Sequence, residues 1–350
     1  MPEDRDFRIV GVGASPYTRK LRAAARFRRL PFRFVVAGSK EANALPKRSL
    51  PLLPYLVAPD ADGALTQVQS DSTPILNFLE EAYPQRLLRP TDPVLRLLDL
   101  LIEDFGDEWL SKCMFHYRWS YGPDTKHASA YLPYTTFMQI APDQGVQAAA
   151  AFAARQISRI GVVGSNTITG PVIEASWRRF LEAFDAHLQN QPFLLGHRPG
   201  AGDFACYGQM TMLVITDPTP AAVASDVSPR AYAWTERCED LSGLDVSQDD
   251  WIDLEEPSET FRALLTEIGR VYAPFMLANA DAVARGAEQV ICEIDGQPWR
   301  QDPFVYQVKC LRWLREAYSA LMPADQGRVD AILQARAVKR CSTERRIPAD

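Results

Sequence analysis

The order of apolar and polar positions predicts a strand, a helix and a second strand at the start of the chain. Residues 7 to 13 (FRIVGVG) and 32 to 36 are short apolar runs of the kind that form buried strands. Between them, residues 17 to 29 are rich in helix-forming residues, and Ser15 and Pro16 mark where the helix begins. This order predicts a parallel crossover unit.

A hairpin and a further helix are predicted to complete this first part. Two apolar segments, 55 to 57 and 65 to 68, flank the turn sequence PDADG at 59 to 63. Residues 72 to 82 then have the pattern of a helix with one partly apolar face. The order β-α-β followed by β-β-α predicts a small α/β domain over residues 1–86.

After the linker LRPTDP at 88 to 93, helical spacing replaces strand patterns. The segments with this spacing are 95–119, 146–160, 171–190, 203–214 and 229–242. They predict an all-helical domain over 87–245. Further helices are expected at 258–286, 303–321 and 325–336, with a short hairpin around 294–296. We therefore expect residues 246–350 to form a helical extension packed on the helical domain.

Charge and composition exclude several classes of partner. The chain has 350 residues, 38 Lys and Arg against 44 Asp and Glu, and a net charge of -6, which argues against a nucleic-acid partner. Its longest apolar run, 148 to 154, is far shorter than the roughly 20 residues of a membrane span, and its start lacks the features of a secretory signal. We expect a cytoplasmic protein with no membrane partner.

The cysteines and histidines show no pattern of a metal site. The six cysteines include no C-x-x-C pair, and the four histidines include no pair spaced as in a zinc-protease helix. The cysteines are therefore expected to be reduced thiols, and no metal is expected.

Three local motifs follow one another in the first part: Ser15-Pro16-Tyr17, then LPYL at 53 to 56, then DSTPI at 71 to 75. Together with the element order, they resemble the N-terminal, thioredoxin-like domain of the glutathione S-transferase superfamily. The stretch FLLGHRPGAGDF at 193 to 204 resembles the motif that opens a buried helix in the C-terminal domain of that family. The chain looks like a serine-type, bacterial-like member with a long C-terminal extension.

Ser15 is the first candidate catalytic residue. A serine followed by Pro16 is a common helix cap, so capping is one interpretation. A helix N-terminus also favours an anion, and a thiolate is the reactive form of a thiol. The resemblance implies that Ser15 donates a hydrogen bond to the thiolate of bound glutathione, with Tyr17 as the fallback donor. Serine cannot form a mixed disulfide, which argues against thiol transfer.

Leu53 and Pro54 are candidate glutathione-binding residues. The resemblance implies a cis bond between them, which would turn the backbone so that it pairs with an extended peptide such as glutathione. The alternative is a plain turn proline, and Pro51 competes for the same role.

Asp71, Ser72 and Lys47 are the remaining candidates for binding the tripeptide. The resemblance implies that Asp71 and Ser72, at the start of a helix, meet the γ-glutamyl end, although helix capping is compatible with both residues. Lys47 or Arg48 in the basic loop would meet the glycyl carboxylate. A solvated loop charge is the alternative for each of these two.

The aromatic run at 115 to 121 suggests a pocket for a second substrate. Phe115, Tyr117 and Trp119 are spaced by two, so they cannot all lie on one helix stripe, and some are expected to face a cleft that accepts an apolar electrophile. Packing in the core is the alternative. Asp203, by contrast, is interpreted as a folding residue that pairs with Gly200 in a capping box.

These features predict an enzyme that activates the thiol of glutathione and conjugates it to a small apolar electrophile. The resemblance also implies a homodimer. One alternative is a non-catalytic binding or assembly module, because residues 110–180 and those after 245 resemble no ordinary member of the family. The other is a lyase, isomerase or dehalogenase that uses the same activated thiolate.

Overall fold

The first part of the chain folds around a four-stranded mixed sheet. The computed structural model describes residues 6–48 and 51–333. The strands are β1 (Phe7–Gly11), β2 (Phe32–Val36), β3 (Tyr55–Pro59) and β4 (Leu65–Ser70), in the spatial order β2-β1-β3-β4. β1 is parallel to β2, and β3 is antiparallel to β1 and β4. The predicted crossover unit and hairpin are both confirmed.

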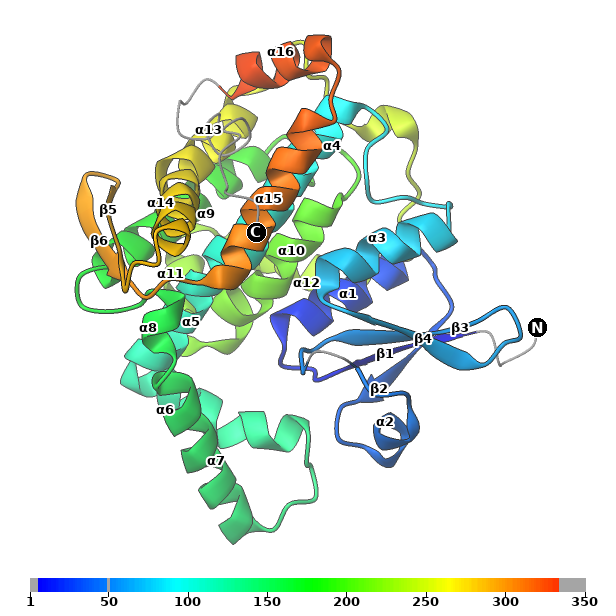
Figure 1. Cartoon of the computed structure of the whole chain (residues 1–350), viewed down its shortest axis with the longest axis vertical. Helices are drawn as coiled ribbons and strands as arrows, with labels where there is room; N and C mark the ends of the chain where they lie inside the picture. The colour runs from blue at the N-terminus through cyan, green and yellow to red at the C-terminus, as the bar shows by residue number, and fades with distance from the viewer. Residues whose placement is uncertain (1–5, 49–50, 334–350) are drawn as a thin grey trace.

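Two helices cover the face of this sheet that is turned towards the rest of the molecule (Figure 1). They are α1 (Pro16–Phe27) and α3 (Ser72–Ala82), and the short helix α2 (Lys40–Ala44) follows β2. α1 packs against α3 and against a helix of the second part, α10 (Ala201–Met210). The start of α1 is therefore held between the sheet and the helical part.

The second part is helical, as predicted. Besides α10, its helices are α4 (Pro93–Phe105), α5 (Ser111–Ser120), α6 (Gly122–Tyr131), α7 (Pro142–Ile157), α8 (Ile160–Val163), α9 (Gly170–Leu188), α11 (Pro218–Val227) and α12 (Pro229–Arg237). The π-helical turns η2 (Gly106–Leu110) and η4 (Thr211–Thr216) follow α4 and α10 directly. The helix predicted at 95–119 is therefore two helices joined through a π turn.

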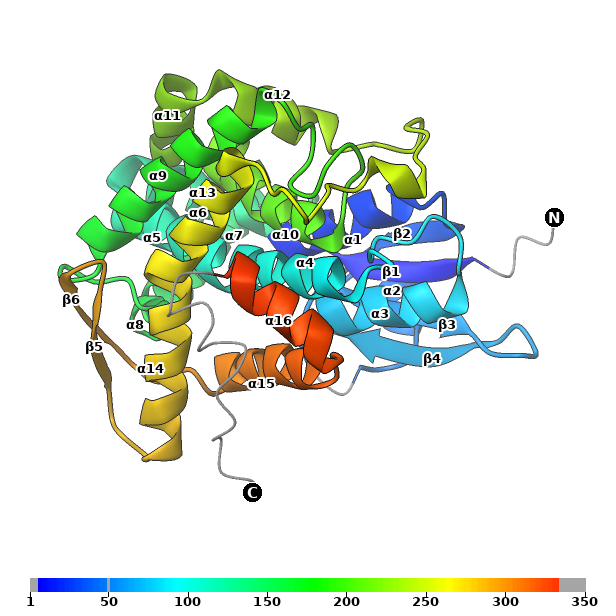
Figure 2. The same ribbon diagram turned by 90° about the horizontal axis from the view of Figure 1, so that it is seen from above.

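The last part adds helices and a hairpin that lie against the second part. It contains α13 (Glu259–Glu267), the π turn η6 (Ile268–Tyr272), α14 (Ala273–Ala284), the hairpin β5 (Val290–Ile294) and β6 (Gln297–Gln301), α15 (Val305–Ser319) and α16 (Pro323–Ile332). α15 and α16 both pack on α4, which Figures 1 and 2 show from two sides. This packing fits the predicted extension, and the exact division at 86 and 245 stays a prediction.

A single apolar core runs through all three parts. One cluster of buried side chains includes Ile9 and Leu56 of the sheet, Leu98 of α4 and Leu311 of α15. A smaller cluster, including Val10 and Val57, lies on the other face of the sheet, because neighbouring strand residues point to opposite faces. None of the described helices has the length and apolar character that a membrane span requires.

Candidate functional site

The register of the sheet brings the three sequence motifs to one end of it. Val10 of β1 pairs with Tyr55 of β3, and Tyr55 pairs in turn with Ser70 of β4. The chain leaves β1 towards Ser15, enters β3 from Pro54 and leaves β4 towards Asp71. These segments therefore lie side by side at one end of the strands, which we call the sheet edge. Their spacing along the sequence does not reveal this.

Ser15 caps α1 and retains a hydrogen that it can donate. Its Oγ accepts a hydrogen bond from the backbone N–H of Thr18 at 3.3 Å, and its own N–H donates to the carbonyl of Val12 at 3.0 Å. Ser15 is half-buried, and among the described residues its hydroxyl hydrogen has no acceptor. Because the first N–H groups of a helix lack partners within it, Ser15 stands beside a partial positive charge.

Tyr17 is turned towards the helical part. Its hydroxyl donates to the backbone carbonyl of Asp107 at 2.9 Å. Burial, with the neighbouring charges of Glu108 and Asp107, raises the pKa of Tyr17 well above its ordinary value. A phenol has only one hydrogen to donate, and here Tyr17 gives it to η2, so the role of Tyr17 as fallback donor stays a prediction.

The Leu53–Pro54 bond is cis, as the resemblance implied. Pro54 is buried at the start of β3. The residue before the competing Pro51 lies outside the described residues. In the adjacent loop, Lys47 is exposed, whereas the Arg48 guanidinium lies 4.8 Å from the ring centroid of Tyr55. Of the two basic candidates, Lys47 is the more open to solvent.

Asp71 stands at the start of α3 with a positive φ of 79° and forms no side-chain cap. Its Oδ2 accepts a hydrogen bond from the Tyr306 hydroxyl at 2.6 Å and lies 3.9 Å from Nζ of Lys309. The capping interpretation of the Asp71 side chain is therefore wrong. Ser72 is buried, with its Oγ 3.5 Å from Nζ of Lys20.

Tyr306 and Lys309 also contact Asp71, although nothing in the sequence marks them as neighbours of this residue. Both belong to α15, which lies more than 200 residues beyond Asp71 in the chain. No motif connects the two segments, and only the packing of α15 on α4 brings them together.

The structure divides the aromatic run instead of gathering it into a pocket. Tyr117 belongs to the main core and stacks on Tyr121, with ring centroids 5.5 Å apart. Trp119 lies between Phe115 and Phe152 of α7, with centroids at 6.3 and 6.1 Å. Tyr117 and Trp119 are both buried, which favours core packing for these two, whereas Phe115 is half-buried. A pocket for an electrophile at this run stays a prediction.

A buried ion network joins α1 to α4 next to the site. Nζ of Lys20 lies 2.7 Å from Glu103 Oε1 and 2.5 Å from Asp107 Oδ2, and Arg89 contacts Asp99 and Glu103. Burial alone would raise the pKa of Glu103, but Arg89 and Lys20 outweigh it and hold that pKa at about 2. The network fixes α1 against α4, so it sets the position of Ser15 indirectly.

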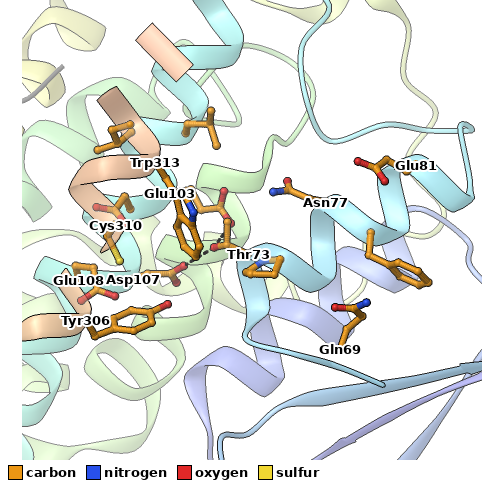
Figure 3. Close-up of a pocket in the computed structure, with 15 residues that line it drawn as sticks. Gln69, Thr73, Asn77, Glu81, Glu103, Asp107, Glu108, Tyr306, Cys310 and Trp313 are labelled. Carbon is orange, nitrogen blue, oxygen red and sulfur yellow. Dashed lines mark hydrogen bonds between the residues drawn. The ribbon is translucent and has the colours of Figure 1, made fainter. Parts of the chain in front are cut away.

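A cavity of about 540 Å³ lies between α3, α4, η2 and α15 (Figure 3). Its polar lining includes Thr73, Asn77, Glu103, Asp104, Asp107, Glu108, Tyr306 and Cys310, and Trp313 and Leu314 form part of its apolar wall. It reaches the start of α3 beside Asp71. Its volume is in the range that small-molecule sites occupy.

The capping box of α10 is confirmed. The Asp203 carboxylate accepts hydrogen bonds from the N–H of Gly200 and the N–H of Leu194, both at 2.9 Å. Asp203 is buried, and both of these bonds come from backbone N–H groups, in agreement with a folding role.

Comparison with protein families gives two matches in the expected order. The model for the glutathione S-transferase N-terminal domain matches residues 10–87, and the model for the glutathione S-transferase C-terminal domain matches residues 174–241. No curated protein matches the sequence.

Several solved structures are similar to this chain at low identity. A Tau class glutathione S-transferase from mango, Mangifera indica, is 16% identical over 74% of this chain and 98% of its own, with a TM-score of 0.39. A glutathione S-transferase from Rhodospirillum rubrum is 20% identical over 74% of this chain and 92% of its own, with a TM-score of 0.37. A glutathione S-transferase from Methylobacterium radiotolerans, in complex with glutathione sulfonate, is 18% identical over 65% of this chain and 93% of its own, with a TM-score of 0.35.

Proposed function

The chain belongs to the glutathione S-transferase superfamily, and from this premise we propose that it binds glutathione at the sheet edge and activates its thiol. The observation that carries the proposal is the convergence of Ser15, cis-Pro54 and Asp71 at one end of the sheet. A tripeptide lying along this edge meets a helix N-terminus, the backbone next to the cis proline and a carboxylate.

Each group has a distinct role in this proposal. The hydroxyl of Ser15 donates a hydrogen bond to the sulfur, and the N-terminal end of α1 favours its negative charge, so the proton leaves the thiol more readily. The backbone next to Pro54 pairs with the peptide, Asp71 meets the ammonium group of the γ-glutamyl residue, and Lys47 meets the glycyl carboxylate. The thiol proton passes to solvent, and the thiolate then forms a bond to an electrophilic carbon of a small apolar substrate while a leaving group departs from that carbon.

A second candidate function is a non-catalytic binding or assembly module. It is favoured by Tyr306 and Lys309, which contact the carboxylate of Asp71 from α15 and so compete with the tripeptide for it. Retention on immobilised glutathione separates the two candidates. A chain that is retained and turns over an electrophile supports the enzyme, whereas a chain that is not retained supports the module.

Replacement of Ser15 by alanine tests the catalytic role of this residue. We expect Ser15→Ala to lower kcat/KM for glutathione conjugation by about a hundredfold or more, because a hydrogen-bond donor to the reacting anion is lost. The variant also loses a helix cap, at about 1 kcal/mol of folding free energy.

Ser258→Ala is the matched control for this loss of a cap. Ser258 caps α13 with a bond of 3.2 Å to the N–H of Phe261, similar to the bond that Ser15 makes. We expect similar losses of stability in the two variants and normal turnover in Ser258→Ala only. Equal turnover in Ser15→Ala and the unaltered chain would reject Ser15 as the donor.

A further inference from the structure

One end of the cavity holds three side chains whose ligand types suit a metal ion. A carboxylate oxygen of Asp104, a carboxylate oxygen of Glu108 and Sγ of Cys310 all lie within 4.8 Å of one another. They come from α4, η2 and α15. Figure 3 shows the sulfur of Cys310 turned towards the carboxylate of Glu108, with Asp107 beside them.

Neighbouring side chains hold both carboxylates in place. The Tyr272 hydroxyl donates to Oδ2 of Asp104, and Nε2 of Gln307 donates to Oε2 of Glu108 at 2.8 Å. Each bond uses one oxygen of its carboxylate. In metal sites, partners of this kind orient the ligating side chains and raise their affinity for the ion.

Two buried acceptors next to these side chains have no partner among the described residues. They are Oδ1 of Asp107 and Oε1 of Gln307. Asp107 is only 6% exposed and lines the same cavity, and Gln307 is 2% exposed. A buried polar atom without a hydrogen bond is costly, so a water molecule or an ion beside the cluster would be stabilised there.

We propose that Asp104, Glu108 and Cys310 bind a divalent cation of the Zn²⁺ class. One thiolate and two carboxylates suit this borderline-soft ion, and three protein ligands leave its fourth position open towards the cavity. Zinc bonds of about 2.0 to 2.3 Å bring ligand atoms within about 4 Å of one another, so small side-chain rotations close the site. The site does not depend on glutathione binding.

A divalent cation binds the two carboxylates and the thiolate only when these groups have lost their protons, which pass to solvent. Binding should therefore weaken as the pH falls.

The test is metal titration of the full chain after removal of bound metal with a chelator. Calorimetry with Zn²⁺ alone should show one site per chain with a Kd in the micromolar range or below. Titration with Co²⁺ should give a thiolate-to-cobalt charge-transfer absorption band. Glu108→Gln should weaken Zn²⁺ binding at least tenfold, and Cys310→Ser should abolish the cobalt band.

Two cysteines outside the cluster provide controls. Cys292→Ser, in β5, and Cys341→Ser, outside the described residues, should both bind Zn²⁺ and Co²⁺ as the unaltered chain does. If Cys310→Ser does not fold, Glu108→Gln and the cobalt spectrum of the unaltered chain decide. The proposal is overturned if the unaltered chain shows no saturable Zn²⁺ binding or no thiolate band, or if Glu108→Gln binds Zn²⁺ with unchanged affinity.

Discussion

At the scale of single residues, the hydroxyl of Ser15 caps α1 and can also serve the proposed thiol activation. As an acceptor it caps the N–H of Thr18, and its hydrogen stays available for a ligand. Capping and thiol activation, which the sequence presents as alternatives, are therefore compatible in this geometry. Asp71 is a different case: its carboxylate does not cap α3 and instead contacts α15.

Residue-level predictions succeeded where the partners are close in sequence. Asp203 and Gly200 are three positions apart, and their capping box could be predicted from the spacing alone. The partners of Lys20, by contrast, are Glu103 and Asp107, more than 80 positions away. A lysine inside a helical segment gives no local sign that it will be fully buried, so this network could not be predicted.

Lys112 provides a pH prediction. Its Nζ donates to the carbonyl of Val163 at 2.8 Å and to Oε1 of Gln301 at 3.3 Å, and it lies 4.0 Å from the ring centroid of Phe275. Burial lowers its pKa from 10.5 to about 7, an effect that the charge of Glu108 offsets only in part. Between pH 7 and about 10.5 the unfolded chain therefore binds more protons at this position than the folded chain.

The contribution of Lys112 to stability should rise with pH in that interval. Compared with Lys112→Met, the unaltered chain should gain up to about 1.4 kcal/mol per pH unit from pH 7 to 9, and no pH-dependent difference should remain well below pH 7. Denaturant unfolding of chelator-treated protein measures this gain. Lys126→Met, at an exposed position, is the control. Parallel stability curves for Lys112→Met and the unaltered chain would contradict the assignment.

At the scale of elements, the position of α1 depends on its contact with α10. Gly208 of α10 faces the start of α1, and a Cβ there would lie 2.6 Å from the carbonyl oxygen of Pro16 and 3.2 Å from Cβ of Lys20. The nearest atom belongs to the backbone, so it cannot rotate away. α1, which Ser15 caps, therefore packs directly on α10 of the second part.

Gly208→Ala should displace the start of α1. We expect this variant to lose both stability and glutathione conjugation, although alanine favours a helix over glycine by about 1 kcal/mol. Gly327→Ala in α16 is the matched control, because nothing lies within 4 Å of its added Cβ. The control should be slightly stabilised and fully active. Thermal unfolding and turnover measure both effects, and a stable, fully active Gly208→Ala would contradict this role.

Element types could be predicted well where the periodicity is continuous. The strands at 32–36 and the helix at 72–82 have the predicted bounds. The π turn η2 was missed because Gly106 packs against the backbone of α10. A Cβ added at Gly106 would lie 2.9 Å from the backbone N of Cys206. That contact is tertiary, and local sequence does not report it. Helices α2, α6, α8 and α11 also escaped prediction.

At the scale of the whole molecule, the extension is part of the same core as the sheet. Leu311 of α15 and Leu21 of α1 belong to one apolar cluster, and each is fully buried. α15 also reaches the proposed glutathione site through Tyr306. The homodimer implied by the family resemblance stays a prediction. α15 and α16 both pack on α4, so the surface of α4 beneath them is not available to a second copy of the chain.

A continuous core predicts cooperative unfolding. Leu311→Ala and Leu21→Ala should each lower the stability by about 2 to 5 kcal/mol, and each should shift one shared transition. Thermal unfolding followed by circular dichroism and by tryptophan fluorescence tests this. A separate, earlier transition in Leu311→Ala alone would show that the extension is an independent domain.

The most direct test of the account is the pKa of the glutathione thiol on the protein. The ultraviolet absorption of the thiolate, followed against pH for the bound tripeptide, measures this pKa. The account predicts a value at least about one unit below the roughly 8.5 of a free thiol, and a return towards that value in Ser15→Ala. A bound thiol that titrates like free glutathione, or equally in the two proteins, would contradict it.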